Sequence, residues 1–169
     1  PRCAVLAPWL DARTSSALEV KGLTWTFVRH AGCVPRDVEP WNADTPPRAW
    51  FRRGALEVAR DLLGSYLVRT APEGVVVVRI TEVEAYRGSE DPASHAYRGL
   101  TERNRSMFER PGTLYVYRSY GIHHCANTSA GPEGVGWGIL IRGGQIIEGE
   151  HVARRRRAGR SDLADGPGK

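Results

Sequence analysis

Lysine is nearly absent from this chain, although the chain is basic. Of the 24 lysine and arginine residues, only Lys21 and Lys169 are lysines, and the other 22 are arginines. An enzyme that forms a Schiff base needs a lysine amine at its active site. The long stretch between the two lysines therefore cannot supply that nucleophile, and its positive charge comes from guanidinium groups.

Cysteine and long apolar runs are scarce as well. Cys3, Cys33 and Cys125 are odd in number, lie far apart and form no CxxC pair. This pattern predicts neither a disulfide framework nor a structural zinc site, so we expect reduced thiols, with Cys125 buried. No stretch approaches the roughly 18 consecutive apolar residues of a membrane span, and no secretory signal pattern is visible.

The length and the charge narrow the class of protein. A chain of 169 residues suits a single domain with its own core. The formal net charge of +5 and the pI of about 9.5 fit a polyanionic partner, although ordinary enzymes reach such values too. Residues 1–50 hold six of the eleven prolines and four of the five tryptophans and show no sustained period. They are predicted to be a poorly structured or extended segment that precedes a domain at 51–169.

Regular elements are predicted after residue 50. The apolar positions of Arg53–Gly64 predict a helix that ends at Gly64, a residue suited to the left-handed cap. The patterns that follow predict strands, a polar loop and two further helices. The strands are Ser65–Arg69, Val75–Tyr86, Leu114–Tyr120, Ile122–Thr128, Trp137–Arg142 and Gln145–Glu148, with a turn at Gly143–Gly144; the loop is Arg87–Leu100, and the helices are Thr101–Glu109 and Gly149–Arg157. The four arginines at 154–157 are typical of a solvated basic face.

The strand Val75–Tyr86 brings acids and a phenol onto one surface. A period of two places Glu82, Glu84 and Tyr86 on the same face. Further phenols recur in the strand that follows the Pro-Gly turn, at Tyr115, Tyr117 and Tyr120. If the two strands are neighbours, carboxylates and aromatic rings face one cleft.

This surface admits more than one chemistry. Carboxylates two positions apart on a strand are separated by roughly 6.6 Å, within the range of inverting sugar hydrolases. A sugar hydrolase that uses Glu82 and Glu84 is therefore one alternative, although phenols followed by arginines are less typical of a sugar cleft. Glu82 is expected to form a structural ion pair instead. A non-catalytic nucleic-acid-binding domain is a further alternative.

Several ordered motifs resemble the alkyladenine (3-methyladenine) DNA glycosylase family. They are EVEAY at residues 82–86, a histidine nine residues after its tyrosine, RNRSMF, PGTLYVYRSYG and an asparagine soon after. The resemblance covers roughly residues 51–169. It implies an α+β fold, a single domain with a curved, mainly antiparallel sheet flanked by helices. Because family members continue beyond the GPGK-like segment, it also implies a C-terminally truncated member.

The resemblance assigns roles to individual residues. Glu84 matches the general base of the family, and Arg142 matches an arginine near the water and the phosphate. The base-pocket positions are matched by Tyr86, His95, Tyr117 and Asn127, and the intercalating position by Tyr120. An enzyme that extracts a base needs flat side chains to hold it and a wedge to fill the gap. Where the family often has an aromatic residue, this chain has His123–His124, of which at most one lines the pocket, because adjacent strand residues point to opposite faces.

The implied function is the excision of alkylated purines, such as 3-methyladenine, from double-stranded DNA by water. The missing lysine favours a monofunctional glycosylase, and the absence of a ligand cluster predicts no metal and no other cofactor. We expect a monomer that binds duplex DNA and no membrane. Its expected compartment is the cytoplasm, on the nucleoid, or the nucleus, and it is not expected to be secreted.

Overall fold

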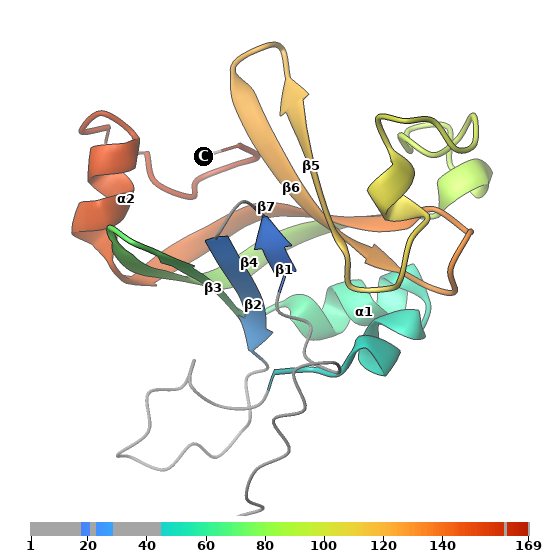
Figure 1. Cartoon of the computed structure of the whole chain (residues 1–169), viewed down its shortest axis with the longest axis horizontal. Helices are drawn as coiled ribbons and strands as arrows, with labels where there is room; N and C mark the ends of the chain where they lie inside the picture. Colours follow the sequence, from blue (N-terminus) through green and yellow to red (C-terminus); the bar gives the residue numbers. More distant parts are fainter. Residues whose placement is uncertain (1–17, 21–22, 29–44, 161, 169) are drawn as a thin grey trace, which may run out of the picture.

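An antiparallel sheet of seven strands organises the described part of the chain (Figure 1). The structure, a computed structural model, describes residues 18–20, 23–28, 45–160 and 162–168. The strand order is β1-β2-β3-β4-β7-β6-β5, with antiparallel neighbours throughout. The strands are β1 (Leu18–Val20), β2 (Leu23–Val28), β3 (Tyr66–Ala71), β4 (Gly74–Tyr86), β5 (Leu114–Ser119), β6 (His123–Ala130) and β7 (Trp137–Glu148). The α+β class predicted from the sequence is confirmed.

Helices flank the sheet, as expected. Within the described ranges they are α1 (Ala55–Leu62), α2 (Glu150–Arg156) and the short 3-10 turns η2 (Arg48–Arg52), η3 (Gly88–Glu90) and η4 (Arg105–Met107). The predicted stop of the first helix is confirmed, since Gly64 has a φ of 81°. Figure 1 shows α1 below the sheet and α2 at the far end of β7. Neither α-helix of the described ranges has the length and apolar content that crossing a bilayer requires.

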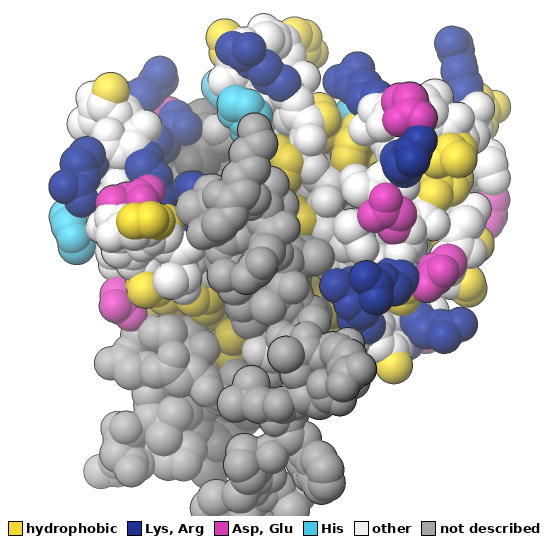
Figure 2. All heavy atoms as spheres, in the orientation of Figure 1, with side chains coloured by type: hydrophobic (Ala, Val, Ile, Leu, Met, Phe, Trp, Pro, Cys, Tyr) yellow, Lys and Arg dark blue, Asp and Glu magenta, His cyan; other side chains and the backbone are white. Residues whose placement is uncertain are grey.

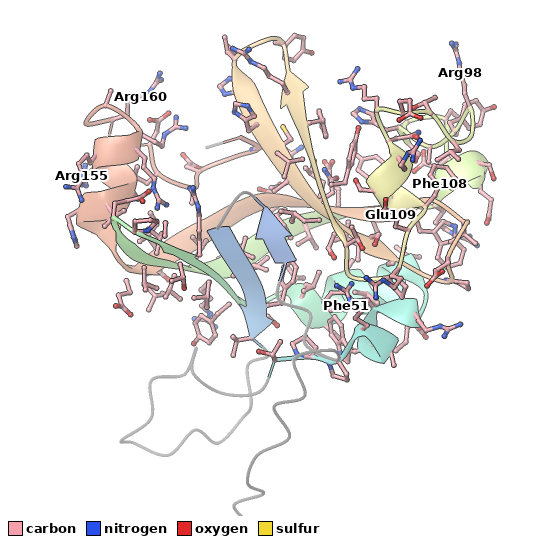
Figure 3. The ribbon with its side chains drawn as sticks, in the orientation of Figure 1. Phe51, Arg98, Phe108, Glu109, Arg155 and Arg160 are labelled. Carbon is pink, nitrogen blue, oxygen red and sulfur yellow. The ribbon has the colours of Figure 1, made fainter. Side chains whose placement is uncertain are left out.

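The main core lies between α1 and the sheet. The buried residues of α1 recur at helical spacing and are Ala55, Val58, Ala59 and Leu62. Phe51, just before α1, is fully buried and contacts Phe27 of β2, with ring centroids 5.7 Å apart. Figure 3 shows Phe51 beneath the sheet beside this helix. Burial of such a side chain contributes about 1.5–3 kcal/mol, so the contact ties β2 to the core.

The strands β1 and β2 lie within residues 1–50, where the sequence predicts no strand. The backbone of β2 pairs with β3 from Thr24↔Thr70 to Val28↔Tyr66, and β1 pairs with β2. Pairing with a neighbour, more than local alternation, determines such a strand, which explains why the pattern did not reveal it. The remaining residues up to 44 all lie outside the described part of the chain.

The glycine pair of β7 corrects one prediction. The sequence predicts a turn at Gly143–Gly144, but β7 runs through both residues. A Cβ atom on Gly144 would lie 2.3 Å from Cγ1 of Val78 and 2.8 Å from the carbonyl oxygen of Arg79. Glycine therefore permits a close approach of β4 to β7 here and does not reverse the chain.

Residues 101–109 correct another prediction. The sequence predicts a helix over Thr101–Glu109, but this stretch forms turns and the single 3-10 turn η4. Thr101 does act as a cap, because its Oγ1 accepts a hydrogen bond from the N–H of Asn104 at 3.3 Å, while Oδ1 of Asn104 accepts from the N–H of Thr101 at 2.7 Å. Asn104 is buried and also bonds the preceding loop, so tertiary contacts replace a continued helix.

Candidate active site

One row of residues crosses four strands of the sheet. The register pairs Glu84 of β4 with Leu140 of β7, Leu140 with Asn127 of β6, and Asn127 with Tyr115 of β5. Directly paired residues of antiparallel strands point to the same face, and neighbouring strands lie about 4.8 Å apart. The sheet itself therefore fixes the backbone positions from which the side chains of Glu84 and Asn127 extend.

An irregularity in the pairing of β4 with β7 determines which side chains of β4 lie on the same face of the sheet as this row. The pairs are Ile80↔Gly144, Glu82↔Gly143 and Val83↔Ile141, so that Thr81 and Arg142 are passed over. Such bulges redirect side chains and occur often beside functional sites. Ile80, Val83 and Ala85 pack on the core, whereas Glu82 and Glu84 lie on the other face. The predicted common face of Glu82, Glu84 and Tyr86 is thus present, and the bulge allows it while Ile80 remains in the core.

Arg142 joins the two carboxylates. Its Nε donates to Oε1 of Glu82 at 2.9 Å, and its Nη1 donates to Oε1 of Glu84 at 2.8 Å. The ion pair expected for Glu82 is confirmed. The adjacent Glu84 carboxylate, followed by the pair with Glu82, raises the pKa of Arg142. The guanidinium remains charged and holds the Glu84 carboxylate in one orientation.

Tyr86 contacts the second oxygen of the same carboxylate. Its hydroxyl donates to Oε2 of Glu84 at 2.5 Å. Burial, and next the hydrogen bond to Glu84, raise the pKa of Tyr86 to about 12. The phenol is therefore protonated at neutral pH and acts as a donor. Glu84 is oriented from both sides, by a phenol on its own strand and a guanidinium on the next.

His95 is positioned by Tyr115 and Asn104, two residues for which the sequence analysis predicted no contact with a histidine. Its Nδ1 lies 2.9 Å from the hydroxyl of Tyr115, and its carbonyl oxygen accepts a hydrogen bond from Nδ2 of Asn104 at 2.9 Å. The same Nδ2 donates to the carbonyl of Gly99, so Asn104 fixes the loop around the histidine. Burial, and next the positive charge of Arg103, lower the pKa of His95, which favours the neutral ring.

Three aromatic rings form a contiguous cluster. The rings of His95 and Tyr117 have centroids 4.3 Å apart, and Tyr117 stacks on Tyr115 at 5.6 Å. A cavity of about 50 Å³ lies against them, lined by Tyr86, Ala93, His95, Met107, Tyr115, Tyr117 and Asn127. Because His95 and Tyr117 touch, no base fits between these two rings, and Tyr86 is the aromatic of the lining that lies outside their cluster. All four base-pocket residues taken from the sequence thus line one cavity.

A wider cleft of about 300 Å³ adjoins this cavity. It shares Tyr86 and Tyr117 with the cavity and is lined by Glu84, Tyr86, Tyr117, Ser119, Tyr120, His123, Cys125, Leu140, Arg142 and Pro167. The lining includes the predicted buried cysteine, which is confirmed as a buried free thiol. His123 lines the cleft, whereas His124 lines other cavities, as expected for adjacent strand residues.

Tyr120 projects from the tip of the β5–β6 hairpin. It is 94% exposed and has a φ of 49°, in the left-handed region that is costly for a residue with a side chain. Figure 1 shows this hairpin rising away from the rest of the sheet. A large exposed phenol on a projecting turn has no packing role in the described structure and is free to contact a partner.

The arginine block of α2 is largely engaged within the protein. Arg154 binds Glu150, Arg156 binds Glu73, and Nη1 of Arg157 donates to the carbonyl of Gly168. Arg155 of the same helix is exposed, and Figure 3 shows it with Arg160 at one end of the molecule and Arg98 at the opposite end. Figure 2 shows basic side chains over α2, over the tip of the β5–β6 hairpin and over the loops at that opposite end. No group of three or more histidine, cysteine or acidic side chains within the described ranges is placed to hold a metal ion.

Comparison with known proteins identifies close relatives of most of the chain. Residues 49–169 match the family model described as methylpurine-DNA glycosylase. A protein of Streptomyces avermitilis named "Putative 3-methyladenine DNA glycosylase" is 54% identical over 125 residues, which are 72% of this chain and 59% of that protein. Proteins of the same name from Leifsonia xyli and Methanocella arvoryzae are 49% and 48% identical, each over 73% of this chain and over 62% and 63% of their own length. The chain spans about three fifths of the length of these curated relatives.

Proposed function

Because the chain belongs to the methylpurine-DNA glycosylase family, we propose that it excises alkylated purines, such as 3-methyladenine, from duplex DNA. The observation that carries this proposal is the position of Glu84. Its carboxylate is oriented by Tyr86 and Arg142 and adjoins an aromatic cavity that has Asn127 in its lining.

In this proposal the target nucleotide leaves the base stack and its base enters the aromatic cavity. Tyr86 lies on one side of the base and the touching pair of His95 and Tyr117 on the other. Tyr120 fills the gap left in the duplex, and Asn127 contacts the edge of the base.

Glu84 acts as the general base for a water molecule in the cleft. The bond between C1′ of the sugar and the base breaks, and its electron pair leaves with the base, which neutralises the positive charge of an alkylated purine. Water forms a new bond to C1′ and gives its proton to Glu84. The negative carboxylate also stabilises the positive charge that develops on the sugar. Arg142 keeps the carboxylate oriented toward this water.

This mechanism needs no lysine and no metal. Both lysines of the chain lie outside residues 22–168, so the proposed enzyme is monofunctional and leaves the DNA backbone intact. The pairing of Arg142 with both Glu82 and Glu84 argues against a sugar hydrolase, because the guanidinium lies between the two carboxylates. We propose a monomer that acts on duplex DNA in the cytoplasm or the nucleus.

The proposal is tested with the purified chain and a duplex that carries 3-methyladenine. Free 3-methyladenine should be released, the strand should remain uncut until alkali is added, and EDTA should change neither result. Selective binding of the methylated duplex without release of the base would indicate the non-catalytic alternative instead.

A further inference from the structure

The carboxylates of the site create an electrostatic problem for the substrate that is proposed above. Arg142 is paired with both Glu82 and Glu84, so these three groups together carry one net negative charge. The site therefore attracts a cationic base but repels the phosphate that accompanies each nucleotide. A phosphate in this cleft needs a cation that is not already committed to a carboxylate.

The lining of the wider cleft contains two side chains that can carry a positive charge, Arg142 and His123. His123 is half-buried and lies on the same face of β6 as Cys125 and Asn127, because the three residues alternate along the strand. Its partner across the hairpin is Ser119, which lines the same cleft. His123 thus lines the same cleft as the exposed Tyr120 and as Arg142.

The segment 162–168 fixes the base of the His123 side chain. A Cβ atom on Gly168 would lie 2.5 Å from Cβ of His123, which shows how closely the backbone of this segment covers it. The segment is itself anchored, since the carbonyl of Gly168 accepts a hydrogen bond from Arg157 and the carbonyl of Ala164 accepts one from the N–H of Gly144. The imidazole therefore projects into the cleft from a fixed position.

We propose that His123 binds a phosphate of the flipped nucleotide as an imidazolium, and that this contact makes DNA binding stronger as the pH falls. This inference rests on the proposed function. The titratable and charged groups that line the cleft with His123 are Glu84 and Tyr86 of β4, Tyr117 of β5, Tyr120 of the following turn, Cys125 of β6 and Arg142 of β7. The covering residues 166–168 add no titratable side chain. The acids of the same segment are Asp162, which pairs with Arg160, and the exposed Asp165.

The physical basis is the coupling of two charges. An imidazolium donates hydrogen bonds and carries a positive charge, and an adjacent phosphate favours this charged form over the neutral ring. Binding of DNA should then take up one proton at His123. A hydrogen bond between two charged groups stabilises a complex by an amount that corresponds to roughly tenfold in affinity.

The test is a binding titration at constant ionic strength between pH 5.5 and 8.5. The probe is a fluorescent duplex with one tetrahydrofuran abasic site, alongside a matched undamaged duplex. An abasic probe leaves the base pocket empty, so titration of His95 does not enter the measurement. The native chain should bind the abasic duplex roughly tenfold more tightly at pH 6 than at pH 8.

Three variants make the test specific. The His123→Gln variant should lose the dependence on pH, while the neighbouring His124→Gln variant, whose ring lines other cavities, should keep it. The His123→Lys variant should bind at pH 8 as tightly as the native chain does at pH 6. The slope of log Kd against log salt should fall by about 0.9 in His123→Gln at pH 6 and remain unchanged at pH 8.

Each result decides one question. A pH dependence that survives in His123→Gln overturns the inference, and so does an equal loss of affinity at every pH, which would indicate a structural role. The pH comparison is made on both duplexes. A native chain that does not prefer the abasic duplex would count against the proposed function, whereas the His123 contact is scored separately, by the pH dependence of binding to the abasic duplex in the native chain and in His123→Gln. Failure to bind either duplex at pH 6 overturns both.

Discussion

The guanidinium of Arg142 and the carboxylate of Glu84 are joined across neighbouring strands, with Nη1 2.8 Å from Oε1. Arg142 occupies the irregular position of β7, and Glu84 lies in the regular part of β4. Glu84 is thus held by regular strand pairing, whereas Arg142 reaches it from a position that the pairing passes over. The orientation of the proposed base therefore depends on the backbone as much as on the arginine.

Replacement of Glu84 by glutamine should reduce release of 3-methyladenine at least 100-fold, because an amide keeps the shape of the side chain but takes no proton. Affinity for the methylated duplex should change little. Both quantities are measured on one oligonucleotide. The Glu82→Gln variant serves for comparison and should lose less activity, since Glu82 contacts Arg142 alone among the site residues described above. Full activity of Glu84→Gln would remove this residue from the proposed role.

The Tyr120→Ala variant should affect duplex DNA more than single strands. A wedge offsets the few kcal/mol that unstacking a base pair costs, and a single strand does not need this compensation. We expect at least a tenfold loss of kcat/KM on a methylated duplex and roughly a twofold loss on the same lesion in a single strand. The Ile122→Ala variant, at another exposed position of the hairpin tip, provides the comparison. Equal losses of Tyr120→Ala on both substrates would contradict a wedge.

Removal of the Tyr115 hydroxyl tests whether His95 must be held in place. The Tyr115→Phe variant keeps the buried ring and its stacking on Tyr117 but loses the 2.9 Å contact to Nδ1 of His95. A net hydrogen bond is worth about 1 kcal/mol, so kcat/KM should fall about fivefold while unfolding by urea changes little. The same variant in a His95→Gln background should show no further loss if the hydroxyl acts through His95.

The lowered pKa of His95 predicts an acid limit to excision. Burial, and next the positive charge of Arg103, favour the neutral ring in the folded protein. The contribution of neutral His95 to the stability of the fold is therefore complete above the ordinary imidazole pKa of about 6.5. This contribution declines as the pH falls below that value. His95 is partly exposed, and solvent therefore moderates the effect on stability. Single-turnover excision should decline below about pH 6.5 because a charged ring repels a cationic base. A His95→Gln variant with the same acid limb would show that another group causes it.

Substitution of the two glycines of β7 should have unequal effects. The Gly144→Ala variant forces its methyl group against Val78 and the backbone of Arg79, and overpacking of this kind costs about 1–3 kcal/mol of unfolding free energy. At Gly143 the nearest heavy atom to a new Cβ lies 3.4 Å away, so Gly143→Ala should cost less. Urea denaturation of both variants gives the comparison. An equal loss would mean that the close approach of β4 and β7 is not the reason for Gly144.

Some of the site follows from local pattern alone. Alternation is a property of neighbouring residues, which is why it placed Glu84 and Tyr86 on one face correctly. The position of His95 does not follow from alternation, because its contact to Tyr115 spans 20 residues and is made by a folded loop. Only the family resemblance brought His95 into the predicted site.

Other features needed tertiary information that the sequence carries weakly. Tyr115 is buried, and its hydroxyl also lies within hydrogen-bonding distance of His95, a contact that no local pattern indicates. The spacing of Thr101 and Asn104 fits a reciprocal cap, a signal that could have identified the brace of the His95 loop. The bulge between β4 and β7 has no sequence signal apart from the glycines, which a turn explains equally well.

The bulge determines which face of β4 carries the two acidic side chains. Ile80 faces the core, and an unbroken alternation from it would bury Glu82 and Glu84 as well. The extra residue, Thr81, shifts the phase so that both acids emerge on the opposite face. The face on which Glu84 lies therefore depends on the presence of an extra residue at position 81 and not on the type of that residue. Position 81 should accept many side chains, whereas regular pairing through Thr81 would turn every side chain from there to the end of the strand to the opposite face.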